Sequence, residues 1–209
     1  MLSRRHLRIK ALQLLYAFIQ SNNDNLVTGE KDLLKSLNKI YELFIYQFSL
    51  LIEITEFAYK RSEENKQKYF PTEEDLHPNT RFINNRIIKM ISNNRDYQRY
   101  YDVYKINWAE EEEMIRKLYK GIIASEEYKA YMDAKIATLN ADKEILIKII
   151  KKHLSRSELL QSFYEEKNIH WSDDFHTANL LLIKAIKGLK EGFGENVKNY
   201  LHCLKTICR

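Results

Sequence analysis

The sequence predicts an all-α protein, and three observations support this. The chain has 209 residues, of which 44% are hydrophobic, which is enough for a buried core. It contains only two prolines and five glycines, too few for an all-β protein, which needs turn signals roughly every 8–12 residues. Apolar residues instead recur at intervals of three and four, the period of a helix. We expect a helical bundle with a long second helix and additional shorter helices.

The first predicted helix covers residues 4–20 and is amphipathic. Ser3 is a suitable N-cap, and Asn22 and Asn23 favour an end to the helix. Its apolar residues recur on one face of a 3.6-residue period. They are Leu7, Ala11, Leu14, Leu15 and Phe18.

The second predicted helix, residues 30–66, is unusually long. Apolar residues keep helical spacing from Leu33 to Thr55 without a glycine or proline. At 1.5 Å per residue this helix would be roughly 50 Å long. The loop that follows, residues 72–80, is the best candidate for a domain boundary. Pro71 precedes it and Pro78 lies within it. We therefore predict an N-terminal unit of residues 1–68 and a second helical unit of residues 69–209.

Shorter helices are predicted in the rest of the chain. Apolar spacing marks segments 82–104, 108–123, 128–136, 145–154, 159–163, 175–186 and 197–207. Ser125 and Ser157 are suited to N-cap two of these helices. The carboxylates from Glu110 to Glu113 suit a helix N-terminus, where the helix dipole favours negative charge.

Positive charge is concentrated at the N-terminus. The chain has 34 basic and 29 acidic residues, a net charge of +5. Residues 1–20 contain Arg4, Arg5, Arg8 and Lys10 but no acid, so the other 189 positions hold 30 basic and 29 acidic residues. The helix dipole disfavours cations near a helix N-terminus, so helix stability does not explain them. This asymmetry indicates an anionic partner.

Three explanations of the basic helix remain open from the residues alone. It could be a solvated helix end, a helix lying on an anionic membrane surface, or a phosphate-binding helix. Guanidinium groups make paired hydrogen bonds to phosphate oxygens, and arginine-rich segments bind RNA. A removable targeting signal is disfavoured, because Arg8, Lys10 and Gln13 interrupt the apolar stretch and no A-x-A-like cleavage site follows.

The sequence offers little support for catalysis or for a bound metal. No glycine-rich phosphate loop is present. His170, Asp173, Asp174 and His176 are metal-binding residue types, but their spacing matches no defined site, and the two aspartates suit the cap of the following helix. We expect a protein that is not an enzyme, with no cofactor and no metal.

Tyrosines and cysteines give two further expectations. Most of the fourteen tyrosines fall on predicted core faces, but Tyr100, Tyr101 and Tyr104 are hard to bury together and could stack on bases. Cys203 and Cys208 cannot form a disulfide framework, which favours a reduced, cytoplasmic setting.

No apolar run approaches the roughly 20 residues of a membrane span.

Two segments of the chain resemble a known family. Residues 3–16, Ser-Arg-Arg-His-Leu-Arg-Ile-Lys-Ala-Leu-Gln-Leu-Leu-Tyr, resemble the opening helix of the transcription antitermination factor NusB, in which an arginine cluster precedes Ala-x-Gln-x-Leu-Tyr. Residues 69–82, Tyr-Phe-Pro-Thr-Glu-Glu-Asp-Leu-His-Pro-Asn-Thr-Arg-Phe, are similar to the long, insertion-bearing NusB forms of Bacteroidetes-type bacteria, as are residues 108–125. The resemblance extends to about residue 189.

The resemblance implies a non-enzymatic RNA-binding protein. NusB proteins are all-α, pair with the ribosomal protein NusE, bind boxA RNA in ribosomal RNA leaders, and assist the RNA polymerase antitermination complex. By residue matching, Arg4, Arg5, Arg8 and Lys10 fall in or beside the RNA-binding cluster, and Tyr16 falls at a family tyrosine near the RNA and the partner.

The chain also departs from the family pattern. His6 stands where arginine is common, which could make the local charge pH-sensitive. The C-terminal helical half of the family, with its Asn-Trp and Ile-Asn-Glu signatures, is absent, which puts NusE binding in question. The alternative function is a helical protein-interaction scaffold that never binds nucleic acid.

Overall fold

The long second helix is the central element of the structure. In the computed structural model, which describes residues 4–21 and 25–189, helix α2 runs from Leu26 to Lys66, a length of about 60 Å for its 41 residues. The helix begins earlier than expected because Asn25 caps it. The Asn25 side chain accepts hydrogen bonds from the backbone N–H groups of Val27 and Thr28.

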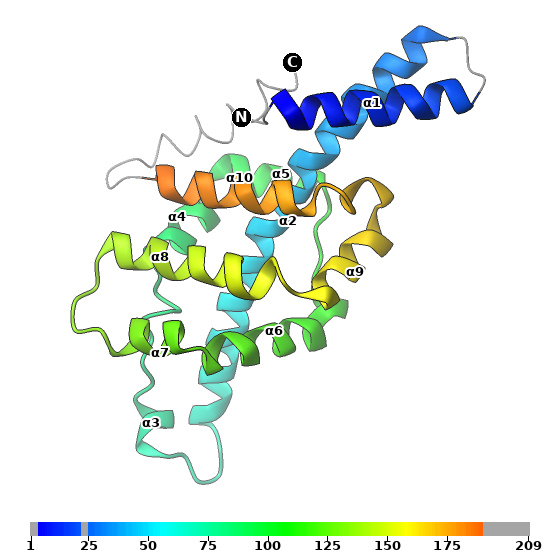
Figure 1. Cartoon of the computed structure of the whole chain (residues 1–209). Helices are drawn as coiled ribbons and strands as arrows, with labels where there is room; N and C mark the ends of the chain where they lie inside the picture. Colours follow the sequence, from blue (N-terminus) through cyan, green and yellow to red (C-terminus); the bar gives the residue numbers. More distant parts are fainter. Residues whose placement is uncertain (1–3, 22–24, 190–209) are drawn as a thin grey trace.

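The other regular elements of the described chain are also helices, and no strand occurs among them, so the all-α prediction is confirmed (Figure 1). The remaining helices are α1 (Arg4–Gln20), α3 (Glu73–Leu76), α4 (Arg86–Ser92), α5 (Arg95–Val103), α6 (Glu112–Ala124), α7 (Glu126–Asp133), α8 (Leu139–Ile149), α9 (Glu158–Lys167) and α10 (Phe175–Gly188).

Most of the helix predictions agree with these bounds. The predicted 4–20 helix is α1, and Ser125 and Ser157 N-cap α7 and α9, accepting from Tyr128 and Leu160. The predicted 82–104 helix is wrong as a single element: it divides into α4 and α5 because Asn94 caps a new helix, its side chain accepting from the Tyr97 N–H. The predicted helix 197–207, Ser3 and Asn22–Asn23 lie outside the described residues.

Helices α6 and α10 pack on α2, as do α4 and α5, and α8 lies between α6 and α10 in Figure 1 and contacts α10 and α4. Aromatic side chains join these parts. The ring of Tyr46, on α2, lies 5.0 Å from Trp171 and 5.8 Å from Trp108, centroid to centroid. The indole N–H of Trp171 donates to the backbone carbonyl of Lys39 at 3.0 Å, and that of Trp108 donates to Ser49 Oγ at 3.0 Å. The two indoles are therefore buried with their polar atoms satisfied.

A buried polar cluster connects α4, α7 and α8. The hydroxyl of Tyr131 donates to Asp142 Oδ1 at 2.7 Å, and the backbone N–H of Arg86 donates to Asp142 Oδ2 at 3.3 Å. The Asn85 side chain donates to the Asp142 carbonyl at 3.1 Å. These bonds offset the cost of burying the Asp142 carboxylate.

The core extends across the predicted boundary at residue 68. Buried apolar residues of α2, from Leu37 to Ala58, belong to the same cluster as those from Phe82 to Leu189. The division of the chain into two units stays a prediction. What the structure shows is that both sides contribute to one core around α2.

Candidate nucleic-acid interface

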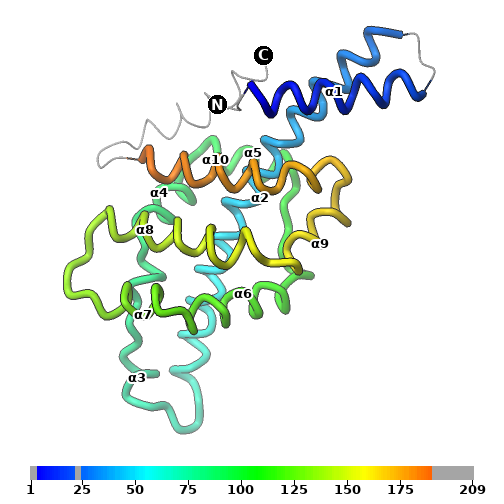
Figure 2. The backbone as a smooth tube through the Cα atoms, in the orientation of Figure 1, coloured from blue at the N-terminus to red at the C-terminus, as the bar shows by residue number. Residues whose placement is uncertain are grey.

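Helix α1 and the first turns of α2 form a hairpin that projects from the helices covering the rest of α2 (Figure 2). Leu7, Leu14 and Phe18 of α1 are half-buried in this pairing. Phe18 lies against Gly29, where an added Cβ would be 3.1 Å from the ring. The glycine therefore lets the two helices approach closely.

A polar contact fixes the other side of α1 to the start of α10. His6 Nε2 lies 3.1 Å from Asp174 Oδ1, and His6 Nδ1 lies 3.1 Å from the Thr177 hydroxyl. Nζ of Lys10 lies 2.8 Å from Asp174 Oδ2. These contacts join residues more than 160 positions apart, so tertiary packing holds the basic helix in place.

The structure corrects the prediction for Lys10. Its side chain is only 6% exposed and is paired with an Asp174 side chain that is fully buried. An ammonium group in this position cannot also reach a phosphate, so Lys10 anchors α1 and leaves the candidate RNA-binding set. One sequence signal could have shown this: on a helical wheel Lys10 falls beside Leu7 and Leu14, on the packed face.

Asp174 also has a different role from the one predicted. It stands at the N-cap position of α10, but its side chain makes no capping hydrogen bond and turns to α1 instead. Burial raises the pKa of the Asp174 carboxyl, and Lys10 and His6 oppose that shift by favouring the charged form. Sequence reasoning missed this residue because its partners are distant in the chain.

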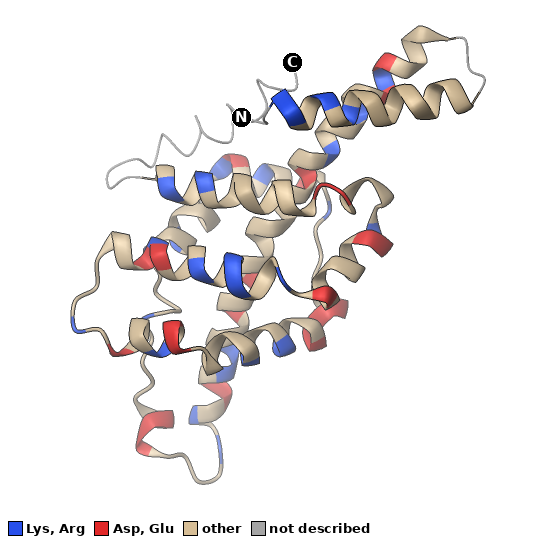
Figure 3. Ribbon diagram, viewed as in Figure 1, with Lys and Arg blue, Asp and Glu red and all other residues tan. Residues whose placement is uncertain are grey.

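The three arginines remain as the cationic end of α1. Arg4, Arg5 and Arg8 are exposed, and none forms an ion pair with a residue that the structure describes. In Figure 3, the blue of Lys and Arg marks the first turns of α1, and α1 contains no acidic residue. Three guanidinium groups are thus available on a helix that packs on α2 and contacts the start of α10.

Beyond the arginines, α1 exposes a continuous apolar face. Tyr16 is 66% exposed and Leu12 is 68% exposed. Ala11 and Leu15 share a helical face with Leu7, Leu14 and Phe18 in the predicted helix, but in the structure both are exposed. The exposed large apolar residues of α1 are Ile9, Leu12, Leu15, Tyr16 and Ile19, and we call them the apolar face of α1. An exposed patch of this kind is typical of a protein-interaction surface.

The other candidate residues do not form a site. Tyr100, Tyr101 and Tyr104 are all half-buried, and the ring of Tyr100 packs edge-on against Tyr41 at 5.1 Å. These three tyrosines, which were candidates for stacking on bases, therefore pack within the fold. In the described part of the chain, no three His, Cys, Asp or Glu side chains lie close enough to hold a metal ion.

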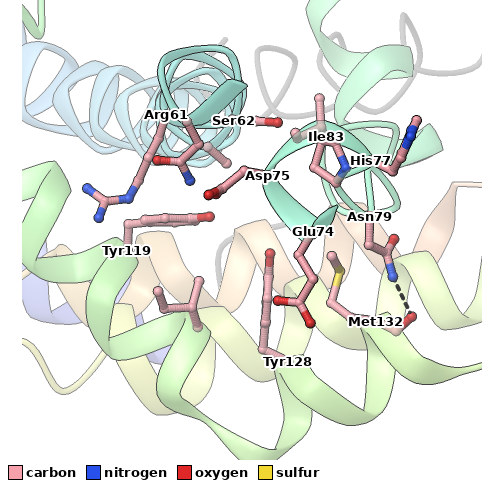
Figure 4. Close-up of a pocket in the computed structure, with 14 residues that line it drawn as sticks. Arg61, Ser62, Glu74, Asp75, His77, Asn79, Ile83, Tyr119, Tyr128 and Met132 are labelled. Atoms are coloured by element: carbon pink, nitrogen blue, oxygen red, sulfur yellow. Dashed lines mark hydrogen bonds between the residues drawn. The ribbon is translucent and has the colours of Figure 1, made fainter. Parts of the chain in front are cut away.

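A pocket of about 490 Å³ lies at the opposite end of α2, between the α3 loop and helices α6 and α7 (Figure 4). Its polar lining is partly used within the fold. Asp75 belongs to the capping box of α3, and the Asn79 amide donates to the Met132 carbonyl at 2.9 Å. Arg61 and Glu74 form no ion pair with a described residue. The pocket contains no paired nucleophile and base.

The fold and the site define an all-α protein with an arginine-tipped helical hairpin. Comparison with protein-family models, with curated proteins and with solved structures finds no match to the chain. Within the described residues, none of the helices combines the length and the apolar character needed to cross a lipid bilayer.

Proposed function

We propose that the protein is a cytoplasmic, non-enzymatic RNA-binding transcription antitermination factor of the NusB type. It would act on boxA-type leader RNA together with NusE and the RNA polymerase antitermination complex, in support of ribosomal RNA transcription. The observation that carries the proposal is the exposure of Arg4, Arg5 and Arg8 at the end of a helix anchored by Asp174.

The arginines suit a phosphate backbone for two reasons. Each guanidinium presents a planar fork of donors that matches phosphate oxygens, and none is neutralised by a described acid. The contacts of Lys10 and His6 with Asp174 also hold the helix that carries the arginines in place in the free protein. Less conformational entropy is therefore lost when RNA binds.

The apolar face of α1 supports a protein partner beside the RNA. Tyr16 and Leu12 are large, exposed and on the same helix as the arginines. A partner such as NusE would bury these side chains and extend the surface that faces the RNA. Tyrosine is also a residue on which a base can stack.

The apolar face equally favours the second candidate, a helical scaffold that binds only protein. The two functions differ in the arginines, since a scaffold does not need them. Deleting residues 1–10 would not separate the two candidates, because it would remove Leu7 and Lys10 and so the docking of α1. Substitutions of the exposed arginines alone are required.

The test measures binding of a labelled leader RNA, with and without NusE, by fluorescence anisotropy at several salt concentrations. Three phosphate contacts to single-stranded RNA predict a slope of log K against log salt of about −2, from −0.7 for each contact. The variant Arg4→Ala, Arg5→Ala, Arg8→Ala should flatten this slope and weaken binding.

The matched control replaces Lys60, Lys68 and Lys89, which are exposed elsewhere, by alanine. It removes the same net charge and should leave the slope almost unchanged. A triple-arginine variant that binds leader RNA like the wild type would exclude the RNA-binding proposal and leave the scaffold.

A further inference from the structure

A second cationic surface lies on helices α8 and α10, away from the arginines. Its members are the exposed lysines Lys148, Lys151, Lys184 and Lys187, and we call them the lysine face. Helices α8 and α10 pack side by side, and Figure 3 shows basic positions along both of them on the same side of the molecule.

Helical spacing explains why these lysines point to solvent together. Exposed positions 140, 144, 148 and 151 follow one side of α8 and the helical turn Ile150–Leu154 after it, where Lys152 is also exposed, and the exposed positions of α10 are 176, 180, 184 and 187. Both sets advance by four, four and three residues, which is one ridge of an α-helix. The opposite sides of the same helices carry buried Ile145, Leu146, Leu182 and Ile186.

The lysine face is not neutralised by neighbouring acids. None of the four lysines forms an ion pair with a described residue, whereas nearby Lys152 is paired with Glu127. Residues 143–156 hold four lysines and one arginine against the single acid Glu144, and residues 175–189 hold two lysines and no acid. Basic residues therefore predominate locally in both segments, and Glu144 is the one acid among the ridge positions named above.

The N-terminal end of helix α1, which carries the arginines, lies beside α10. Gln13 contacts Asp173, Lys10 contacts Asp174, and His6 contacts Thr177. In these three contacts the residue numbers decrease along α1 while they increase from Asp173 to Thr177, so the two segments run antiparallel. The arginine end of α1 therefore points along α10 in the direction of its lysines. Lys184 lies seven residues beyond Thr177, or about 10 Å along the helix axis.

We propose that the lysine face binds the phosphate backbone of an RNA segment that continues from the arginines of α1. This inference rests on the proposed function and extends it from a short site to a path across the molecule. Lysine is a compact point charge that suits contacts to a backbone without reading bases. Lysine is depleted from protein–protein interfaces, and Leu180 is the one large apolar residue exposed on the described part of α10. An acidic protein is therefore the weaker candidate.

The test compares two single-stranded RNAs, one of about 4 nucleotides, which is too short to extend from the arginines across the lysine face, and one of about 30, by anisotropy over a salt series. The lysine variant carries Lys148→Gln, Lys151→Gln, Lys184→Gln and Lys187→Gln. A matched control carries Lys60→Gln, Lys68→Gln, Lys89→Gln and Lys135→Gln, which remove the same charge from other exposed positions. Circular dichroism verifies that all variants fold.

For the long RNA, the lysine variant should reduce the magnitude of the salt slope by about 3, from 0.7 for each of four contacts, and should weaken binding at least about tenfold. For the short RNA it should bind like the wild type. The arginine variant should weaken both RNAs. This pattern would show that the arginines bind both RNAs and that the lysine face binds only the part of the long RNA beyond them.

The other outcomes overturn one proposal or both. A lysine variant that behaves like its control, or that weakens both RNAs equally, overturns the extended path. An arginine variant that binds the short RNA normally overturns the proposed function independently. If poly-glutamate binds the lysine face more tightly than RNA of equal charge, the partner is an acidic protein and the inference fails.

Discussion

The ion pair between Lys10 and Asp174 allows a sharp test of how α1 is held. The substitution Lys10→Met keeps the length of the side chain but removes the ammonium group that pairs with buried Asp174, which keeps its contact with His6. At 2.8 Å the Coulomb attraction is about 6 kcal/mol with an effective dielectric constant of about 20, much of it cancelled by desolvation.

The expected net loss in unfolding free energy is about 3 kcal/mol, since breaking a buried pair typically costs 3–5 kcal/mol and His6 remains. Urea unfolding measures this loss, and hydrogen exchange of the α1 amides reports whether α1 detaches first. The control Arg8→Met changes an exposed side chain of the same helix and should alter stability by less than about 0.5 kcal/mol.

The two variants should differ in RNA binding when both are measured under conditions where they are folded. Arg8→Met should reduce the magnitude of the salt slope by about 0.7, while Lys10→Met should leave it unchanged. The double variant Lys10→Met, Asp174→Asn should be more stable than the sum of its single variants predicts, because neither charge is then left unpaired. If Lys10→Met flattens the slope and spares stability, Lys10 is exposed in solution and the reasoning is refuted.

Three further predictions concern the core and its pH dependence. Tyr131→Phe removes the hydroxyl that donates to buried Asp142 and should lower the unfolding free energy by about 1–3 kcal/mol in urea titrations; no change would mean that Asp142 finds another donor. Trp171→Ala leaves a large cavity against α2 and should cost about 3–5 kcal/mol, whereas Trp171→Phe should cost less. Burial lowers the pKa of His153 below its ordinary 6.5, so the unfolded state binds more protons and stability should fall as pH drops below about 6.5. His153→Gln should weaken that dependence, and an unchanged pH profile would contradict it.

The candidate site shows where prediction from the sequence succeeded and where it failed. Arg8 and Lys10 are two residues apart, carry the same charge and share the resemblance to an RNA-binding helix. The sequence therefore predicts the same role for both, but Arg8 is exposed, whereas the Lys10 side chain is only 6% exposed and lies beside Asp174. The difference depends on α10, which lies more than 160 residues further along the chain.

The same limit applies to the surfaces. The spacing of apolar residues assigned one packed face to α1, yet Ala11 and Leu15 are exposed and Tyr16 belongs to a second, apolar face. Counts of charge along the chain indicated a near balance outside the N-terminus. Residues 143–156 are basic in the sequence itself, but only the packing of α8 beside α10 places them next to the helix that carries Lys184 and Lys187.

The sequence by itself determined the helices, because helical period, caps such as Ser125 and Ser157, and the scarcity of glycine and proline act through near neighbours in the chain. Only the tertiary structure decided which charges are buried and which are exposed. That choice depends on contacts between helices distant in sequence, since an ion pair such as Lys10–Asp174 requires both helices to be packed on α2.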